Sequence, residues 1–444
     1  MAENLRIAIV GAGMGGLAAA LSLAKAGHKN ITLYETAPGL GFVGAGIQLA
    51  PNMARILDRL GCWKQIAAEA VQCGDTSIRE GSSDKELGHV KLDYVEKTYG
   101  YPHMVGHRAS LAGAMHDGCV KEPGIKFALG SLISDVEFGA KPSFKLTPLS
   151  SPDEARRVEC DILLGCDGVK SQTRVAMLQA RGETADVKDS GQAAYRIMLT
   201  REQMQNDPEL IALLDADTVT RWIGEKKHII AYPIHNKQIY NISTAQPDVN
   251  FAGAPNSTYT TKGSKSAMMQ VYGDFCPMIH RMLDLVPDGE VVEWKLRVHE
   301  PLSSWVLDST ALVGDACHPT LPHLAQGAAQ AIEDGAVLGV VLNPKRIADG
   351  SPSTITKALK IYEKVRKERA EALVELAAEN GRSMHLGSGK AKEERDKIFA
   401  ALKTGKGPVP DKWADADVQR MIYGVDITAE AENLCKEEGF VARL

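Results

Sequence analysis

Short apolar runs separated by turn residues characterise the first part of the chain. Ile7 to Val10 form an apolar run, glycines follow, and the next segment is rich in Ala and Leu. A second apolar run covers Ile31 to Tyr34. Short runs with β-branched residues are typical of buried strands, whereas the Ala/Leu-rich segment suits a helix. The pattern therefore predicts a strand, a tight turn, a helix and a second strand.

The hydrophobic pattern changes twice further along the chain. Apolar runs at Cys160 to Cys166 and Ala311 to Gly314 predict two more buried strands. Between about residues 176 and 296, alternating segments predict an antiparallel sheet, and they cover Gln192 to Leu199, Thr218 to Ile223, His228 to Ile234 and Gln238 to Thr244. Ile355 to Asn380 reads as a long amphipathic helix, and we expect its Lys/Arg face to be solvated.

Composition narrows the class of protein. With 444 residues the chain exceeds the usual size of a single core, so two domains are expected. The net charge of -5 gives no basic excess for nucleic acid. The eight cysteines contain no C-x-x-C pair, so neither disulfides nor a metal site are predicted, and a reducing compartment is favoured. With no signal peptide and no apolar run of about 20 residues, we expect a cytoplasmic protein without a membrane segment.

The first turn carries candidate nucleotide chemistry. Gly11, Gly13 and Gly16 have G-x-G-x-x-G spacing between the predicted strand and helix, and Glu35 ends the second strand. Such glycines permit a tight turn, the approach of a pyrophosphate and close helix packing, while the acid holds a ribose hydroxyl. An acid would repel a 2′-phosphate, which favours ADP-ribose or the ADP half of FAD over NADP. The alternative is a glycine-rich turn that binds nothing.

Several polar residues stand at predicted strand ends or helix starts. Asp167 and Asp315 each follow a buried strand, where the ligand crevice of a parallel sheet lies, although an ordinary Asp-Gly turn also explains Asp167. Arg108 precedes a predicted helix and suits either a phosphate or solvent. Other candidates are Gln48 in the glycine-rich segment from Gly39 to Asn52, Gly327 and Ala328 at a helix start, and His228 and Tyr232 on one strand face, for which core packing is the alternative.

Three patterns in order carry a family resemblance. They are GAGMGG with Glu35, GCDGVKSQTR from Gly165 and GDACHPTLPHLAQGAAQAIEDG from Gly314. Together they resemble the class A FAD-dependent aromatic hydroxylases, most closely the salicylate hydroxylase group. The resemblance covers Arg6 to about Asn380.

The resemblance implies an α/β fold with a Rossmann-type FAD-binding domain, an inserted antiparallel-sheet substrate domain and a long C-terminal helix. We place the discontinuous FAD-binding domain at 1–74, 102–177 and 297–345, the substrate domain at 75–101 and 178–296, and a C-terminal helical region at 346–444. A monomer or homodimer is expected.

The resemblance also implies roles for matching residues. The cofactor-binding set would be Gly11, Gly13, Gly16, Glu35, Gln48, Arg108, Asp167, Asp315, Gln326, Gly327 and Ala328. His323, His228 and Tyr232 resemble catalytic or pocket residues of the salicylate and hydroxynicotinate hydroxylases. His323 is the first choice for a base, because ionising a phenol asks for a pKa near neutrality. No metal is implied.

The implied reaction uses NADH or NADPH, O₂ and a flavin C4a-hydroperoxide to hydroxylate a small aromatic substrate. Salicylate or a related hydroxybenzoate, with decarboxylation, is the leading hypothesis. Alternatives are a non-decarboxylating enzyme like 3-hydroxybenzoate 6-hydroxylase or a 6-hydroxynicotinate hydroxylase, although Gln48 departs from the histidine of the latter. A flavin oxidase or dehydrogenase and a non-catalytic nucleotide-binding protein are alternatives from other classes.

Overall fold

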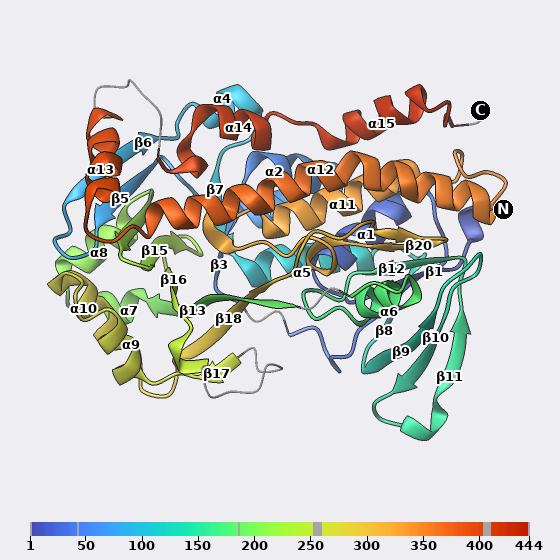
Figure 1. The fold of residues 1–444 in the computed structure, drawn as a ribbon, viewed down its shortest axis with the longest axis horizontal. Coiled ribbons are helices and arrows are strands. Elements are labelled where there is room, and N and C mark those ends of the chain that lie inside the picture. The colour runs from blue at the N-terminus through green and yellow to red at the C-terminus, as the bar shows by residue number, and fades with distance from the viewer. Residues whose placement is uncertain (1, 42–43, 185–186, 252–259, 403–409, 443–444) are drawn as a thin grey trace.

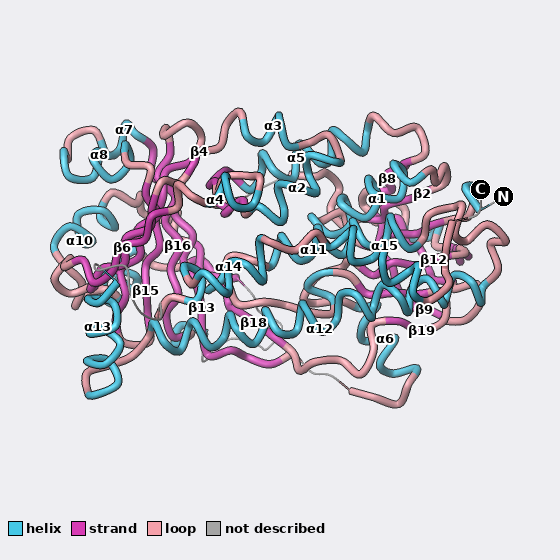
Figure 2. Tube along the Cα trace, turned by 90° about the horizontal axis from the view of Figure 1, so that it is seen from above, coloured by secondary structure: helices cyan, strands magenta, loops and turns pink. Residues whose placement is uncertain are grey.

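Two large sheets lie toward opposite ends of the long axis of the molecule (Figures 1 and 2). The computed structural model describes residues 2–41, 44–184, 187–251, 260–402 and 410–442. Residues 42–43 of the glycine-rich segment from Gly39 to Asn52, and parts of the predicted substrate and C-terminal regions, lie outside these ranges. In the described part, no helix combines the length and apolar character needed to cross a bilayer.

The first sheet confirms the strand–turn–helix–strand prediction. Its strand order is β19 (Val306–Leu307), β20 (Thr310–Leu312), β12 (Ile162–Gly165), β1 (Ile7–Val10), β2 (Ile31–Tyr34) and β8 (Ile125–Ala128). All neighbouring pairs are parallel except β19 and β20. The β1 strand is buried at every position, as a parallel strand covered on both faces should be.

Small residues let two helices pack closely against this sheet and each other. Helix α1 (Met14–Ala26) contacts α11 (Gly327–Val341), and both are largely buried. A Cβ added at Gly335 would lie 2.6 Å from the backbone nitrogen of Ala19. Glycine at this position therefore permits the close approach of the two helices.

The second sheet has eight strands, and it confirms the four strands predicted from alternation. Its order is β17 (Thr260–Lys262), β18 (Val292–Val298), β13 (Lys188–Thr200), β16 (Ile239–Pro247), β15 (Lys227–Ile234), β14 (Thr218–Gly224), β5 (Asp75–Glu80) and β6 (Glu86–Lys91). Neighbouring strands among these four pair antiparallel, as expected, whereas β14 and β5 are parallel. A strand from the first quarter of the chain thus joins this sheet.

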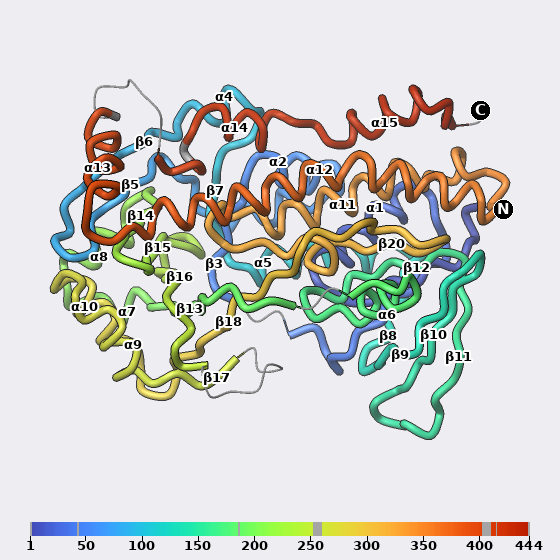
Figure 3. Tube along the Cα trace, viewed as in Figure 1, coloured from blue at the N-terminus to red at the C-terminus, as the bar shows by residue number. Residues whose placement is uncertain are grey.

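Helix α12 (Pro352–Met384) runs along the long axis and reaches from one sheet region to the other (Figure 1). The chain after it turns back, so that α14 (Ala416–Tyr423) and α15 (Ile427–Glu437) return toward the N-terminus (Figure 3). The prediction of a long helix is therefore confirmed, with ends a few residues beyond those expected.

Smaller elements complete the fold. Two three-stranded sheets are formed by β11 (Arg156–Glu159), β10 (Ser143–Pro148) and β9 (Ser131–Glu137), and by β3 (Gly46–Leu49), β7 (Met104–His107) and β4 (Val71–Gln72). The other helices are α2 (Pro51–Arg59), α3 (Trp63–Ala67), α4 (Val95–Tyr99), α5 (Arg108–Val120), α6 (Gln172–Ala180), α7 (Arg201–Met204), α8 (Pro208–Asp215), α9 (Lys265–Val271), α10 (Pro277–Asp284) and α13 (Lys390–Leu402).

Candidate active site

A cavity of about 370 Å³ is lined by segments that follow strands of the first sheet and by strands of the second sheet. One side comprises the glycine turn after β1, the segment after β20 and the start of α11. The other side comprises side chains of β13, β15 and β16. The lining residues include Gly13, Gln48, Arg108, Arg196, Tyr232, Ser243, Asp315, Gly327 and Ala328. Segments far apart in the sequence therefore meet around one space.

The glycine turn has the shape that a pyrophosphate needs. Gly11 has a φ of 99°, and a Cβ there would lie 2.4 Å from the carbonyl oxygen of Cys166. At Gly13, no protein atom lies within 4 Å of an added Cβ, so the backbone faces open space on the cavity side. The carboxylate of Glu35 accepts a hydrogen bond from the Ala12 amide at 2.9 Å. This arrangement fits the ADP half of FAD.

Two alanine substitutions should separate folding from FAD binding in this turn. In Gly16→Ala, the new Cβ would lie 2.0 Å from the Gly11 carbonyl oxygen, so we expect a lower melting temperature and loss of FAD. Gly13→Ala should keep the melting temperature of the apoprotein but weaken FAD binding about 10- to 100-fold, the equivalent of 1–3 kcal/mol of overpacking. FAD titration and thermal unfolding measure both effects. Gly39→Ala, which meets no atom within 4 Å, is the control, and equal FAD affinity in Gly13→Ala and this control would contradict the assignment.

Arg108 and Asp315 bring opposite charges to the cavity wall. Both side chains are exposed to this space, Arg108 at the first residue of α5 and Asp315 just after β20. Although its side chain faces this space, the carboxyl group of Asp315 lies deep in the protein, and the poor solvation there raises its pKa. His318 and Arg108 counteract this effect. A carboxylate and a guanidinium placed here can accept from ribityl hydroxyls and meet a phosphate, respectively.

Asp167 does not line the cavity through its own side chain, although Cys166 and Gly168 beside it do. Its carboxylate accepts from the hydroxyl of Ser171 at 2.5 Å and from the amide and hydroxyl of Thr173, both at 3.0 Å. These bonds satisfy the start of α6. The cofactor role assigned to Asp167 stays a prediction, and its contacts here match the turn alternative.

Of the three residues at the start of α11 that are expected beside the flavin ring, two line the cavity and one does not. Gly327 and Ala328 line the cavity, where the positive end of the helix dipole favours negative charge. Gln326 is buried instead, and its Oε1 accepts from Asn52 at 3.1 Å and from Gln330 at 3.3 Å. The side chain of Gln326 therefore stabilises the helix start through buried hydrogen bonds and does not face the cavity.

A buried group of charges underlies this helix start. Arg366 of α12 is fully buried and contacts Asp334 at 2.8 Å and Glu333 at 2.6 Å. Asp334 also accepts from the Gly314 amide at 2.8 Å and contacts His318 at 2.7 Å. Burial alone would raise the pKa of Asp334, but the His318 and Arg366 contacts hold it below its usual value. The group thereby fixes the turn that carries Asp315.

The expectation that the basic face of α12 is solvated is wrong for two residues. Arg366 is completely buried, and Arg369 contacts Glu333 at 2.9 Å with little exposure. Arg369 also donates to the carbonyl of Ile422 at 3.0 Å, which ties α14 to the same group. Periodicity alone did not reveal that these cations face two buried acids on another helix.

Gln48 lies at the cavity wall and is supported by a buried histidine. The Nε2 of His103 lies 3.2 Å from the Oε1 of Gln48, and the ring packs edge-on to Trp413 at 4.9 Å between centroids. Burial lowers the pKa of His103 to about 3. The ring is therefore neutral in the folded protein at neutral pH.

This histidine should make the protein less stable in mild acid. Unfolding restores a pKa of about 6.5, so between pH 6.5 and 3 the unfolded chain binds a proton that the folded chain does not. Stability from this group is present above pH 6.5 and falls as the pH decreases. Between pH 7.5 and 5.5 the loss should be about 1.4 kcal/mol, and His103→Gln should remove it.

Urea unfolding at both pH values measures the difference. His235→Asn, which changes an exposed histidine, is the control and should keep the wild-type pH dependence. The same dependence in His103→Gln as in wild type would show that His103 does not contribute.

Arg196 is a cavity residue that the sequence analysis missed. It lies on β13, is half-buried and stacks over the Trp294 ring at 4.8 Å from its centroid. Burial and the nearby Arg108 lower the pKa of Arg196 to about 10, so it remains charged at neutral pH. A lone arginine in the apolar strand sequence AAYRIML was the available signal. Its charge faces the same cavity as Tyr232, whose pKa is raised by burial.

The near-neutral pKa expected for His323 is wrong, because burial lowers it to about 3. His323 is not part of the cavity lining, and its Nε2 lies 3.0 Å from the Oε1 of Gln192. His228 is also buried behind the wall and contacts His385, at 2.7 Å between ring nitrogens. Of the three predicted catalytic residues, only Tyr232 reaches the cavity.

Comparisons with known proteins agree with this geometry. A family model described as "FAD binding domain" matches residues 4–217. The chain is 30% identical to FAD-dependent monooxygenase OpS4 of Beauveria bassiana, covering 97% of each chain. It is also 30% identical to the 3-hydroxybenzoate 6-hydroxylase of Klebsiella oxytoca, covering 87% of this chain and 90% of that protein.

A solved structure of similar fold is a salicylate hydroxylase substrate complex, with a TM-score of 0.77, 22% identity and 97% coverage of both chains. This likeness confirms the expected fold class. From its family match, its relatives and the residues around its cavity, the chain belongs to the FAD-dependent monooxygenases of the class A flavoprotein hydroxylases.

Proposed function

We propose that the protein hydroxylates a small phenolic acid, with salicylate or a related hydroxybenzoate as the leading class and loss of CO₂ accompanying the reaction. The observation that carries this proposal is Arg196, a charged and half-buried guanidinium on the cavity wall. A guanidinium pairs well with a carboxylate or a phenolate. NADH or NADPH is the proposed electron donor, and bound FAD, once reduced, would supply one oxygen atom of O₂ to the ring.

The chain's own residues would hold and ionise the substrate. The positive charge of Arg196 favours the phenolate over the neutral phenol and so lowers the pKa of a bound phenol. Because burial raises its pKa, Tyr232 stays protonated and can donate a hydrogen bond to a substrate oxygen. Gly327 and Ala328 place the helix start where negative charge on the flavin would be stabilised.

A non-decarboxylating hydroxylation is the second candidate, and the 30% identity to a 3-hydroxybenzoate 6-hydroxylase favours it. A 6-hydroxynicotinate substrate is a third possibility, since a 6-hydroxynicotinate 3-monooxygenase of Bordetella bronchiseptica is also 30% identical. All three substrates carry a hydroxyl and a carboxyl group on a ring. Arg196 can serve either group, so product analysis must separate them.

The test is a screen of phenolic and hydroxypyridine acids for stimulated oxidation of NADH and NADPH. The product is identified by mass after reaction in ¹⁸O₂, and CO₂ is measured in parallel. We expect one labelled oxygen in the product and CO₂ equal to the product formed. Labelled product without CO₂ supports the second candidate, whereas oxidation without label would indicate a flavin oxidase or dehydrogenase.

The assignment of His323 as the base remains a competing proposal that one variant can test. If Arg196 stabilises the phenolate, His323→Ala should retain FAD and keep the wild-type pH profile of kcat/KM. If His323 were the base, the wild-type profile would contain an ionisation that the profile of His323→Ala lacks. Steady-state kinetics from pH 5.5 to 9 with the best substrate measure the difference, and loss of that ionisation would restore His323 as the base.

A further inference from the structure

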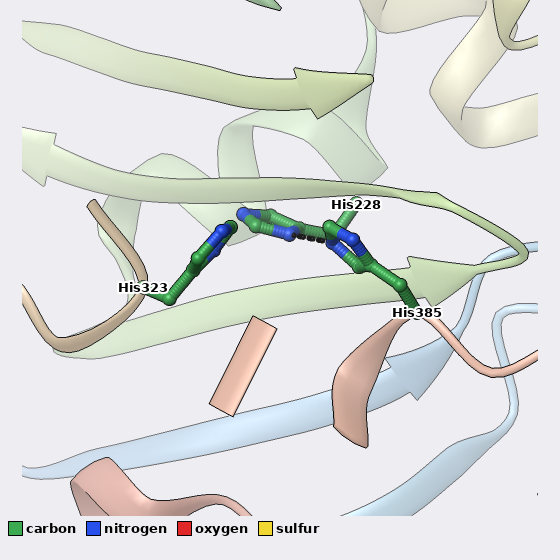
Figure 4. A group of neighbouring side chains, drawn as sticks. All are labelled: His228, His323 and His385. Carbon is green, nitrogen blue, oxygen red and sulfur yellow. Dashed lines mark hydrogen bonds between the residues drawn. The ribbon is translucent and has the colours of Figure 1, made fainter. Parts of the chain in front are cut away.

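Three histidines from distant parts of the chain meet behind the cavity wall. His228 lies on β15, His323 in the short helix η5 (Pro322–Leu324), and His385 directly after α12. Figure 4 shows their rings turned toward one another, with a hydrogen bond between His228 and His385. We propose that His228, His323 and His385 form a binding site for one divalent transition-metal ion, with zinc as the ion of matching chemistry.

The spacing of the rings suits a shared ion. One ring nitrogen of each residue lies within 4.8 Å of the other two. Zinc binds imidazole nitrogen at about 2.0–2.1 Å, which places tetrahedral ligand atoms about 3.3 Å apart. Small side-chain rotations bridge this difference. The 2.7 Å contact between Nδ1 of His228 and Nε2 of His385 is shorter, so an ion would separate these rings and replace the proton they share.

The surroundings of His323 hold its ring in an orientation that suits a metal ligand. Its Nδ1 is buried without a hydrogen-bond partner in the described structure, while its Nε2 contacts Gln192 at 3.0 Å. Metal-binding histidines commonly donate their second ring nitrogen to such an outer partner. A Cβ at Gly381 of α12 would lie 2.5 Å from Cδ2 of His323, so glycine is needed to seat this ring.

Nearby positive charges do not exclude a cation, because each is paired with a carboxylate. Arg221 contacts Asp411 at 3.1 Å, and Arg395 contacts Asp396 at 2.7 Å. Asp411 also accepts from Asn380 at 3.1 Å, next to the seat of His323. A second group, Cys317, His318 and Asp334, is less suitable, since the carboxylate oxygens of Asp334 already serve Arg366, His318 and the Gly314 amide.

The site would differ from the reaction centre in place and in role. Pro322, next to His323, and Ile230, two residues after His228, line the cavity, but the histidines themselves do not. An ion held here would join a strand of the substrate-facing sheet, the segment before α11 and the end of α12. It would stabilise the cavity wall without contacting the reacting atoms.

Titration of the FAD-loaded protein with Co²⁺, followed by competition with Zn²⁺, tests the proposal. We expect one equivalent of bound Co²⁺ with weak absorption bands at wavelengths longer than those of the flavin. His385→Gln should weaken binding about 100-fold, and Gln192→Leu, which removes only the outer partner, about 10-fold. His235→Asn is the control for an exposed histidine and should bind Co²⁺ like the wild type.

X-ray absorption of the zinc-loaded wild type gives an answer that does not depend on how the variants fold. Scattering from three imidazoles without sulfur supports the site. Less than one equivalent at micromolar Co²⁺, sulfur in the zinc shell, or unchanged affinity in a folded, FAD-containing His385→Gln would each overturn the proposal. Sulfur would direct attention to Cys317.

Discussion

Arg366→Met should lower the melting temperature by roughly 10 °C and release FAD. The substitution leaves Glu333 and Asp334 in the protein interior without their fully buried cation. Removing one partner of a buried ion pair costs about 3–5 kcal/mol, which in a domain of this size corresponds to a shift of several degrees or more. Because Asp334 holds the Gly314 amide, the turn that carries Asp315 should loosen as well. Thermal unfolding and the flavin content of the purified protein measure both effects.

Lys364→Met provides a matched control on the same helix. Lys364 pairs with Glu438 at 2.7 Å, but both side chains are well exposed. Exposed ion pairs contribute little to stability, so this variant should unfold within about 2 °C of the wild type and keep its FAD. If Arg366→Met behaved in the same way, the buried charge group would not support the cofactor site.

Arg196→Met should reduce kcat/KM for the preferred phenolic acid about 100-fold while FAD stays bound. A hydrogen bond to a charged group contributes about 1.5–3 kcal/mol, and its loss leaves the substrate anion in a partly buried cavity. Most of the change should appear in KM, because the guanidinium contacts bound substrate before and during the reaction. Steady-state kinetics and the ratio of product formed to NAD(P)H consumed measure it.

Two further variants serve as comparisons for Arg196→Met. Arg196→Lys keeps the charge but not the planar guanidinium, so it should recover part of the lost activity. Arg201→Met removes an arginine that pairs with Asp215 near the surface and should leave kcat/KM unchanged. Equal activities of Arg196→Met and Arg201→Met would rule out Arg196 as the anion-binding residue.

Local signals predicted the strands of the first sheet and its glycine turn well. The glycines at 11, 13 and 16 carry their information in backbone geometry, because a Cβ at Gly11 or Gly16 meets backbone atoms within 2.4 Å. The strands near Gly11, Cys166 and Gly314 could also be predicted, because continuous apolar runs are typical of strands covered on both faces. These strands pair in one sheet. Such features depend on neighbours in the sequence and can be recognised from it.

Properties set by distant partners could not be predicted in this way. The sequence presents Arg366 as one basic residue of an amphipathic helix, but its partners lie about thirty positions earlier on α11. The pKa of His323 depends on burial by β15, α12 and the loop after it. Arg196 was missed because alternation identifies a strand face without telling which cavity that face lines.

The position of α12 late in the sequence also bears on synthesis of the protein. The acids that fix the Asp315 turn are made before Arg366, and the arginine reaches them only when α12 has formed. A nascent chain that has left the ribosome only as far as α11 would carry the glycine turn, but its two acids would lack the arginine that pairs with them in the folded protein. Firm capture of the flavin should therefore wait until α12 has been translated and has folded against α11.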